Sequence, residues 1–328
     1  MNLMNAVTAI IALLAVSACP PAEAVQLRDF APRGSTIKSM TGFEEHTLQH
    51  MWDKYNAYAG SPPGTFGGQL PPIVRGGLQR RAYHFLCVFL YIHQLPQNNW
   101  DGVFKLCNGK KIFRMTATHW QPMHDVADAL ASIITEIVYD DRLDLFNHVG
   151  GPFSYFYTGI VDVFPVFVPA PHSFSMRRQL FQPKYDACVY KIQIAVTFMG
   201  NIILWTGPHL GCESDKKIWD DTWDVHPFYW WEWWLADLGY VGALGLIYKF
   251  KVVASAAMLY FNNVHEWFRN RVENVIGRVK AHRLFKRGCY RGSYAHLAPL
   301  ITIVGHVTAF ELRARQRFET IGPWRHKY

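Results

Sequence analysis

Three carboxylates in the second half of the chain have positions suited to binding hard metal ions. Asp162 lies in the apolar segment 160–166, where an isolated carboxylate is costly unless a cation or hydrogen-bond donors meet it. Asp237 follows an aromatic segment and precedes Gly239, and Glu273 lies within an expected helix. Because oxygen ligands favour Mg²⁺ or Mn²⁺, the three could together hold two divalent ions. Two such ions about 4 Å apart would stabilise the attacking and leaving oxygens of a phosphodiester displacement.

Each carboxylate also has a purely structural interpretation. Asp237 could form a turn, and Asp162 could accept bonds from local donors. Glu273 could form an ion pair with Arg269, which precedes it by one helical turn. Gly277 costs about 1 kcal/mol relative to alanine in a helix interior, so we expect something to approach the helix closely there.

The segments that would position these carboxylates alternate between strand and helix patterns. Expected strands are residues 155–168, 190–197 and 202–206, with a turn at 199–201 and a break at Gly207-Pro208. Expected helices are residues 212–222 and 258–286, and residues 229–236 form an aromatic strand or helix. This order is typical of an α/β domain. Six of the 12 tryptophans fall between positions 219 and 234, where a packed aromatic core is the first expectation and base stacking the second.

The residues before position 150 indicate a mostly helical region. Apolar periodicity predicts helices over residues 44–58, 78–93 and 120–139, within a helical region spanning 41–150. Residues 25–40 lack periodicity and are interpreted as a linker. Residues 1–24 are either a signal peptide or an apolar N-terminal helix, because the run at 6–18 is too short to cross a bilayer. No later apolar stretch reaches about 18 residues, so no transmembrane segment is expected.

Composition excludes several classes of protein. Half of the 328 residues are hydrophobic and 18% are charged, which excludes a disordered or collagen-like chain and argues against a coiled coil. The six cysteines include no C-x-x-C pair, which argues against a disulfide scaffold or a zinc ribbon. Buried free thiols are the expectation.

Positive charge is concentrated near the C-terminus. The chain carries a net charge of +8, and residues 249–328 contain 15 Lys and Arg against 4 Asp and Glu. Such a region suits a polyanion, although a solvated helix face is the alternative. The candidate DNA-binding residues are Arg269, Arg278, Lys280, Arg283, Lys286 and Arg287. Because they spread around a helix at about 100° per residue, we expect only two or three phosphate contacts from the last five.

Three stretches of the C-terminal half carry a family resemblance. They are GPHLGCESD at 207–215, LADLGYVG at 235–242 and YFNNVHEWFRNRVENVIGRVK at 260–280. Together they resemble the DDE-superfamily endonuclease domain of PIF/Harbinger-type transposases, over residues 153–292. In the last stretch, Arg269, Glu273, Gly277 and Lys280 match the family pattern. The 35 residues between Asp237 and Glu273 are a spacing that such transposases favour.

The resemblance implies an α/β fold, namely an RNase H-like mixed sheet with flanking helices, preceded here by the helical N-terminal region. It implies Asp237 and Glu273 as metal ligands for Mg²⁺ or Mn²⁺. Asp162 is the candidate for the first ligand, although Val163-Phe164 follows it where the family usually has Gly-Thr; Asp186 and Asp144 are the fallback candidates. Asp215 matches an acidic position of the family that is not usually counted among the three ligands and that could contact the ligand residues without binding the metal itself. Residues 293–328 are left as a basic C-terminal extension.

The function implied is that of a transposase-derived DDE endonuclease that cuts or joins DNA in the nucleus, with DNA as its partner and homo-oligomers as an option. A domesticated DNA-binding protein with a decayed catalytic site is the first alternative. A secreted binding protein is the second, and it depends only on the N-terminus. A wrongly assigned first exon would also explain that N-terminus.

Overall fold

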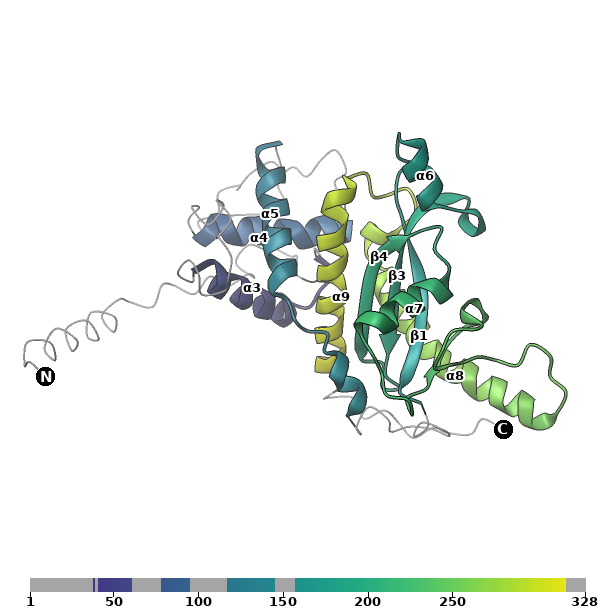
Figure 1. The fold of residues 1–328 in the computed structure, drawn as a ribbon. Helices are drawn as coiled ribbons and strands as arrows, with labels where there is room; N and C mark the ends of the chain where they lie inside the picture. The colour runs from purple at the N-terminus through teal and green to yellow at the C-terminus, as the bar shows by residue number, and fades with distance from the viewer. Residues whose placement is uncertain (1–37, 39–40, 61–77, 95–116, 145–156, 317–328) are drawn as a thin grey trace, which may run out of the picture.

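The computed structural model describes residues 38, 41–60, 78–94, 117–144 and 157–316. The expected signal peptide or N-terminal helix and nearly all of the expected linker therefore lie outside the described residues. A helical layer leads into a mixed six-stranded sheet that is flanked by helices (Figure 1). The strands are β1 (Gly159–Phe167), β2 (Phe181–Gln182), β3 (Ala187–Val196), β4 (Ile202–Leu210), β5 (Trp234–Leu235) and β6 (Leu246–Ile247). The helices are α3 (Glu45–Gly60), α4 (Leu78–Gln94), α5 (Ala117–Ile133), α6 (Phe174–Leu180), α7 (Asp215–Val225), α8 (Ala256–Val279) and α9 (Tyr294–Gln316).

The central strand β1 brings two distant parts of the sequence together. It pairs antiparallel with β3, and β3 pairs antiparallel with β4 in the hairpin that the sequence predicted. On its other edge β1 pairs in parallel with β5, and Ile160 lies opposite Leu235. Asp162 and Asp237 each follow these paired residues by two positions, so the strand register places both acids at the same level of the sheet.

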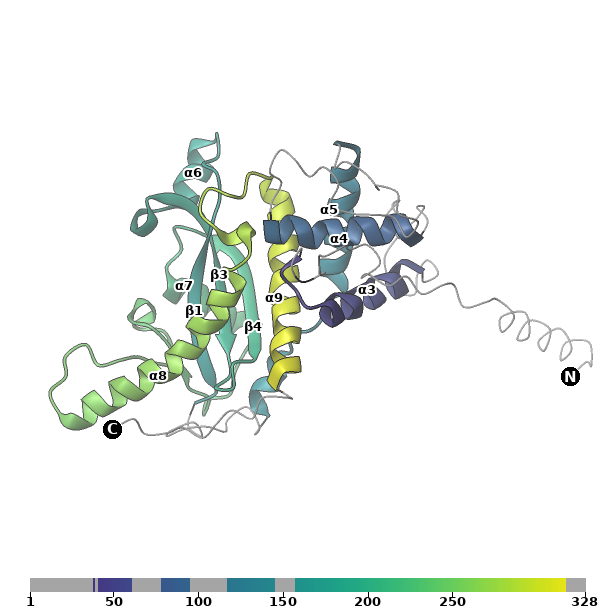
Figure 2. The same cartoon turned by 180° about the vertical axis from the view of Figure 1, so that it is seen from behind.

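The two faces of the sheet are covered by different helices. Alternate residues of β1 point to opposite faces, so Val161 joins the core with Trp219 of α7 while Phe164 joins the core with Phe268 of α8. The two views agree that α7 and α8 lie on opposite sides of the sheet (Figures 1 and 2). Serine side chains cap both helices, since Ser214 accepts a bond from the backbone of Lys217 and Ser255 begins α8 in the same way.

Helix α9 differs from the expected basic extension at residues 293–328. Its apolar side chains, including Leu300, Ile301 and Val304, are fully buried. Helix α9 contacts β4 of the sheet and α5 of the N-terminal helices. Residues 294–314 are long and apolar enough to cross a membrane by length and composition, contrary to the expectation that no such stretch exists, but more than half of this window is buried inside the protein. The helix therefore joins the two layers as a core element (Figure 2).

Several predicted boundaries were wrong. The helix expected over 120–139 ends at Ile133, and residues 139–143 form a separate 3-10 turn (η3, Tyr139–Leu143). Strand β4 continues through Gly207-Pro208, because a register shift beside β3 accommodates the residues that were expected to end it. The helix expected over 258–286 ends at Val279, and a 3-10 turn (η7, Arg283–Phe285) follows.

The expectations for aromatic and sulfur side chains were only partly correct. Only Trp234 and Leu235 of the segment 229–236 form a strand. Trp219 and Trp234 are buried, whereas Trp230 is 89% exposed and its neighbours are half-exposed. Two of the described cysteines are buried, but Cys212 is exposed. The packed aromatic core that the sequence favoured therefore holds for Trp219 and Trp234, whereas Trp230, Trp231 and Trp233 lie at the surface.

Candidate active site

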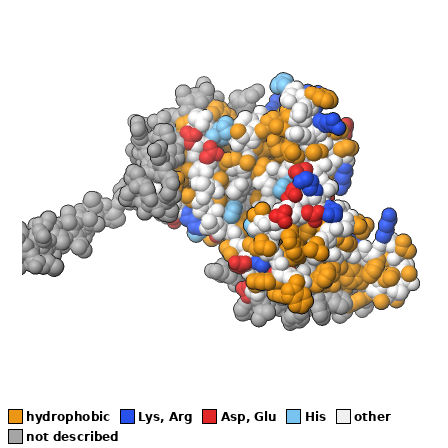
Figure 3. Space-filling model, in the orientation of Figure 1, with side chains coloured by type: hydrophobic (Ala, Val, Ile, Leu, Met, Phe, Trp, Pro, Cys, Tyr) orange, Lys and Arg blue, Asp and Glu red, His pale blue; other side chains and the backbone are white. Residues whose placement is uncertain are grey.

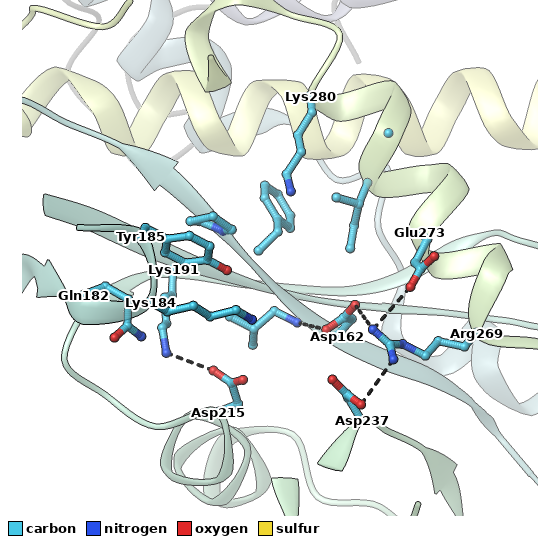
Figure 4. A pocket seen from close by; sticks show the side chains of 15 residues that line it. Asp162, Gln182, Lys184, Tyr185, Lys191, Asp215, Asp237, Arg269, Glu273 and Lys280 are labelled. Atoms are coloured by element: carbon cyan, nitrogen blue, oxygen red, sulfur yellow. Dashed lines mark hydrogen bonds and ion pairs between the residues drawn. The ribbon is translucent and has the colours of Figure 1, made fainter. Parts of the chain in front are cut away.

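A pocket of about 430 Å³ opens where β1, α7, α8 and the turn before β3 meet (Figure 4). One side is acidic and is lined by Asp162, Asp215, Asp237 and Glu273. The opposite side is basic and polar, with Lys184, Tyr185 and Lys280. The turn that carries Lys184 and Tyr185 is a 3-10 helix, η5 (Pro183–Tyr185). The acidic side also contains two cations, Lys191 and Arg269, each of which forms an ion pair with the acids there.

One guanidinium lies among the three candidate ligands. Arg269 Nη1 lies 3.2 Å from Asp237 Oδ1, and Arg269 Nη2 lies 3.2 Å from Glu273 Oε1. The same Nη2 is 4.0 Å from Asp162 Oδ2. Figure 4 shows the three carboxylates pointing toward this one side chain, Asp162 from β1, Asp237 from the segment just after β5 and Glu273 from α8. Because Asp162 and Glu273 share a nitrogen, their oxygens are no further apart than the sum of these two distances, which is within the roughly 8 Å that two shared ions would need.

Asp162 is the most buried of the three acids. Its side chain is 18% exposed, and burial raises its pKa to about 6. The backbone N–H of Val163 donates to Asp162 Oδ1 at 2.8 Å and opposes that rise, as does the positive charge of Arg269. The strand thus presents a desolvated carboxylate with one fixed donor, which is the environment in which a nearby cation has the strongest effect.

Asp237 stands at the start of a short turn that Asp215 supports. The turn is η6 (Leu238–Tyr240), and a Cβ added at Gly239 would lie only 2.9 Å from Asp215 Oδ2. Lys191 in turn donates to Asp215 Oδ1 at 2.9 Å and to the carbonyl of Glu213 at 2.7 Å. Any side chain at position 239 would therefore displace the Asp215 carboxylate. Asp215 is held by Lys191 instead of pointing to Arg269.

Tyr240 is a member of this site that the sequence reading did not single out. Its hydroxyl is fully buried and has no hydrogen-bond partner within the described structure. Burial raises its pKa, and the charges of Asp162, Asp215 and Asp237 raise it further. The neutral phenol can therefore donate a hydrogen bond to an acceptor that comes within reach, or accept one from a donor. The Asp-x-Gly-Tyr motif, of which Tyr240 is the last residue, is the sequence feature that could have indicated this tyrosine.

Gly277 does not have the role expected for it. A Cβ at this position would meet nothing within 4 Å, so no other part of the described chain packs closely there. Gly277 instead lines the open pocket one turn after Glu273. The close approach inferred from the sequence would have to come from a bound molecule.

The fallback acids lie elsewhere. Asp186 follows η5 in a left-handed conformation with φ of 47°, and its carbonyl accepts a bond from Arg287. Asp144 ends the η3 turn, outside the pocket lining. Neither contacts the Arg269 guanidinium. Asp162 is thus the acid that the fold places beside Asp237 and Glu273.

The basic residues do not share one face. Lys280 lines the acidic pocket, with its amine 5.6 Å from the centre of the Phe164 ring. Arg278 lines a different pocket of about 170 Å³ together with His93. Arg287 packs over the ring of Phe167, 5.7 Å from its centre. Only Arg269 and Lys280 of the six candidate DNA-binding residues therefore line the acidic pocket, and Lys184 joins them from a part of the chain that the sequence had not indicated.

The donor chemistry of this site fits hard divalent ions. Three carboxylates offer oxygen ligands of the kind that Mg²⁺ and Mn²⁺ prefer. Across the ranges that the model describes, however, no group of three or more His, Cys, Asp or Glu side chains is arranged to hold an ion as it stands. The physical reason is that Arg269 lies between the acids, so a positive charge already neutralises them.

Replacing Arg269 with Gln should lower the free energy of unfolding by about 1–2 kcal/mol in EDTA, because three carboxylates would then repel one another without a counter-ion. Added Mn²⁺ should restore more stability to this variant than to the unchanged protein. Urea unfolding with and without the metal measures both effects. Arg278→Gln, on the same helix but at the other pocket, is the matched control. Identical unfolding curves in EDTA for Arg269→Gln and the unchanged protein would contradict the counter-ion role.

The fold and site together define an RNase H-like domain with an acidic pocket. In comparisons with known proteins, residues 161–308 match the family model described as DDE superfamily endonuclease. The match begins within β1 and ends within α9, so it includes every acid of the pocket and just under half of the chain. No curated protein and no solved structure matches the chain. The chain is therefore similar, over these residues, to DDE superfamily endonucleases.

Proposed function

We propose that the protein is a transposase-derived DDE endonuclease that cuts or joins DNA phosphodiesters, of the PIF/Harbinger type and acting in the nucleus. The observation that carries the proposal is the convergence of Asp162, Asp237 and Glu273 in one pocket of an RNase H-like sheet. These residues would hold two Mg²⁺ or Mn²⁺ ions. The ions, when bound, would supply charge stabilisation for the attacking and leaving oxygens.

The remaining pocket residues have roles that follow from their positions. Lys184 and Lys280 face the acids across the cavity, and neither forms an ion pair with a described carboxylate. Desolvation lowers the pKa of Lys280, Asp162 opposes that effect, and the like charge of Lys184 adds to it. Two unpaired cations that repel each other are suited to an anion placed between them, and a DNA phosphate is such an anion.

A domesticated DNA-binding protein with a decayed site is the second candidate. The observation in its favour is that Arg269 occupies the space among the acids, where cations would have to enter. Val163-Phe164 after Asp162, in place of the Gly-Thr usual in the family, supports the same alternative. Both candidates bind DNA, but only the endonuclease requires the acids for chemistry.

Nicking of supercoiled plasmid separates the two. The purified chain should convert supercoiled DNA to nicked circles in Mg²⁺ or Mn²⁺ and should not do so in EDTA or Ca²⁺, because Ca²⁺ binds oxygen ligands with looser geometry. A parallel mobility-shift assay in EDTA measures binding alone. Binding without nicking in any divalent ion would favour the domesticated protein and overturn the nuclease.

A further inference from the structure

Exposed apolar side chains are concentrated in one short part of the chain. Thirteen of the 18 large hydrophobic side chains that are exposed among the described residues lie between positions 225 and 260. Figure 3 shows hydrophobic side chains gathered over the lower part of one face and continuing along the projecting end of α8. Scattered exposed hydrophobics are ordinary, but a continuous concentration marks an interaction surface.

The surface has two parts. The first, which we call the platform, consists of Val225, Tyr229, Trp230, Trp231, Trp233, Leu238, Val241 and Leu244. The second, which we call the arm, consists of Phe250, Val252, Val253, Leu259 and Tyr260. The arm comprises the loop before α8 and its first turns, and it extends away from the sheet in both views (Figures 1 and 2).

A buried ion pair beneath the platform fixes its backbone. Glu232 is buried, and it accepts bonds from Arg142 Nε at 3.0 Å and from the backbone N–H of Tyr229 at 3.1 Å. With Glu232 turned inward, the tryptophans on either side of it are turned outward. The rings of Tyr229 and Trp231 stack at 5.4 Å with an angle of 4° between their planes. A buried ion pair thus presents aromatic side chains in a fixed arrangement, which lowers the entropy cost of binding.

The charge of this surface does not suit DNA. Residues 225–260 contain two acidic and two basic side chains, so their formal charge is zero. Of these, Glu232 is buried with Arg142 and Lys249 pairs with Glu266. Stacking surfaces for single strands combine aromatic rings with a positive groove, and the positive groove is absent from residues 225–260. The surface is therefore suited to another neutral, apolar protein surface.

The size of the surface matches a stable protein interface. Aromatic side chains bury about 150–250 Å² each, so the platform and arm together expose on the order of 1,000 Å² of apolar area. A standard interface buries about 800 Å² on each partner. Because the chain carries a net charge of +8, contact between two copies costs least repulsion through a region of little charge, and residues 225–260 are such a region.

We propose that the platform and arm form a two-fold interface between two copies of this chain, with the arm of each copy packed on the platform of the other. A two-fold contact uses the same surface on both copies, so the neutral apolar surface meets itself without a charge mismatch. Each arm–platform contact then occurs twice. This inference does not depend on catalysis, and it would hold for a nuclease or for a binding protein.

Sedimentation velocity of the full chain, treated with nuclease to remove DNA, tests the proposal. We expect a dimer at about 50 µM, with little dependence on salt. Trp230→Ser combined with Val252→Ser should weaken dimerisation by at least about 100-fold. Phe174→Ser is the matched control, since Phe174 is 78% exposed but lies on α6, outside the surface. It should leave the dimer intact.

A second readout guards against misfolding of the double variant. A photo-crosslinking amino acid at position 230 should give a covalent dimer whose crosslinked peptide lies within residues 250–260. A chain that is monomeric at about 50 µM overturns the proposal. So does a dimer that the double variant retains, or a crosslink that maps outside the arm. Sensitivity of the dimer to Phe174→Ser would likewise place the interface elsewhere.

Discussion

Purified Asp237→Asn protein should cleave plasmid DNA at least about 100-fold more slowly than the unchanged protein in Mg²⁺, a loss of about 3 kcal/mol or more in transition-state stabilisation. The amide keeps the size of the side chain but removes one negative charge from the site where Asp237 meets Arg269. Hard cations are brought together by anionic oxygens, so an amide is a poor replacement. Initial rates of nicking measure the loss, and a mobility shift in EDTA should show DNA affinity largely retained.

The control for this variant is Asp186→Asn. Asp186 lies outside the pocket lining, and asparagine tolerates its left-handed backbone. The Asp186→Asn variant should cleave DNA at the rate of the unchanged protein. Undiminished cleavage by Asp237→Asn would exclude Asp237 as an essential metal ligand, and an equal loss in both variants would indicate a general effect on folding.

Lys184→Gln combined with Lys280→Gln should weaken binding to duplex DNA by roughly tenfold or more at 0.1 M salt. If each amine neutralises one phosphate, the slope of log K against log salt should flatten by roughly 0.9 for each lost contact. The two lysines line the pocket on the side facing the acids, which is why we expect both to lie near the bound strand. Fluorescence anisotropy in EDTA over a range of salt concentrations measures affinity and slope without cleavage.

The matched control removes the same charge elsewhere. Arg278→Gln with Lys286→Gln also removes two positive groups. Arg278, however, lines the other pocket together with His93, and Lys286 lies close enough to lower the pKa of His93 by its charge. This variant should retain more of the affinity and most of the slope. Equal losses in the two double variants would mean that net charge, and not the pocket, governs binding.

Local patterns in the sequence predicted the elements that carry the acids. Helix α8 repeats apolar residues at helical spacing, with Phe268, Val272 and Val275 on its buried face, so its position was predictable to within a few residues. The alternation of β3 and the turn before β4 likewise predicted a hairpin. These features depend on neighbours close in the chain, and a single sequence records such neighbours directly.

Helix α9 could not be predicted in the same way. Its residues are apolar on nearly every side, and Pro299 and Gly305 interrupt the pattern, so no polar face marked a helical period. Gly305 is in fact required, because an added Cβ would lie 2.6 Å from the ring of Trp205 on β4. Only contact with the sheet on one side and with α5 on the other explains why this segment is a helix.

The sequence by itself determined which acids were available, and the spacing of Asp237 and Glu273 indicated their use together. The tertiary structure decided which of the candidate first acids lies beside them, namely Asp162, and that Arg269 contacts all three. It placed Lys184 and Lys280 in the lining of the same pocket. It also decided that the tryptophans beside Glu232 point outward, since the buried partner Arg142 lies 90 residues away. Charge interactions and burial act through space, so residues that are far apart in the chain combine only when the strand register and helix packing bring them together.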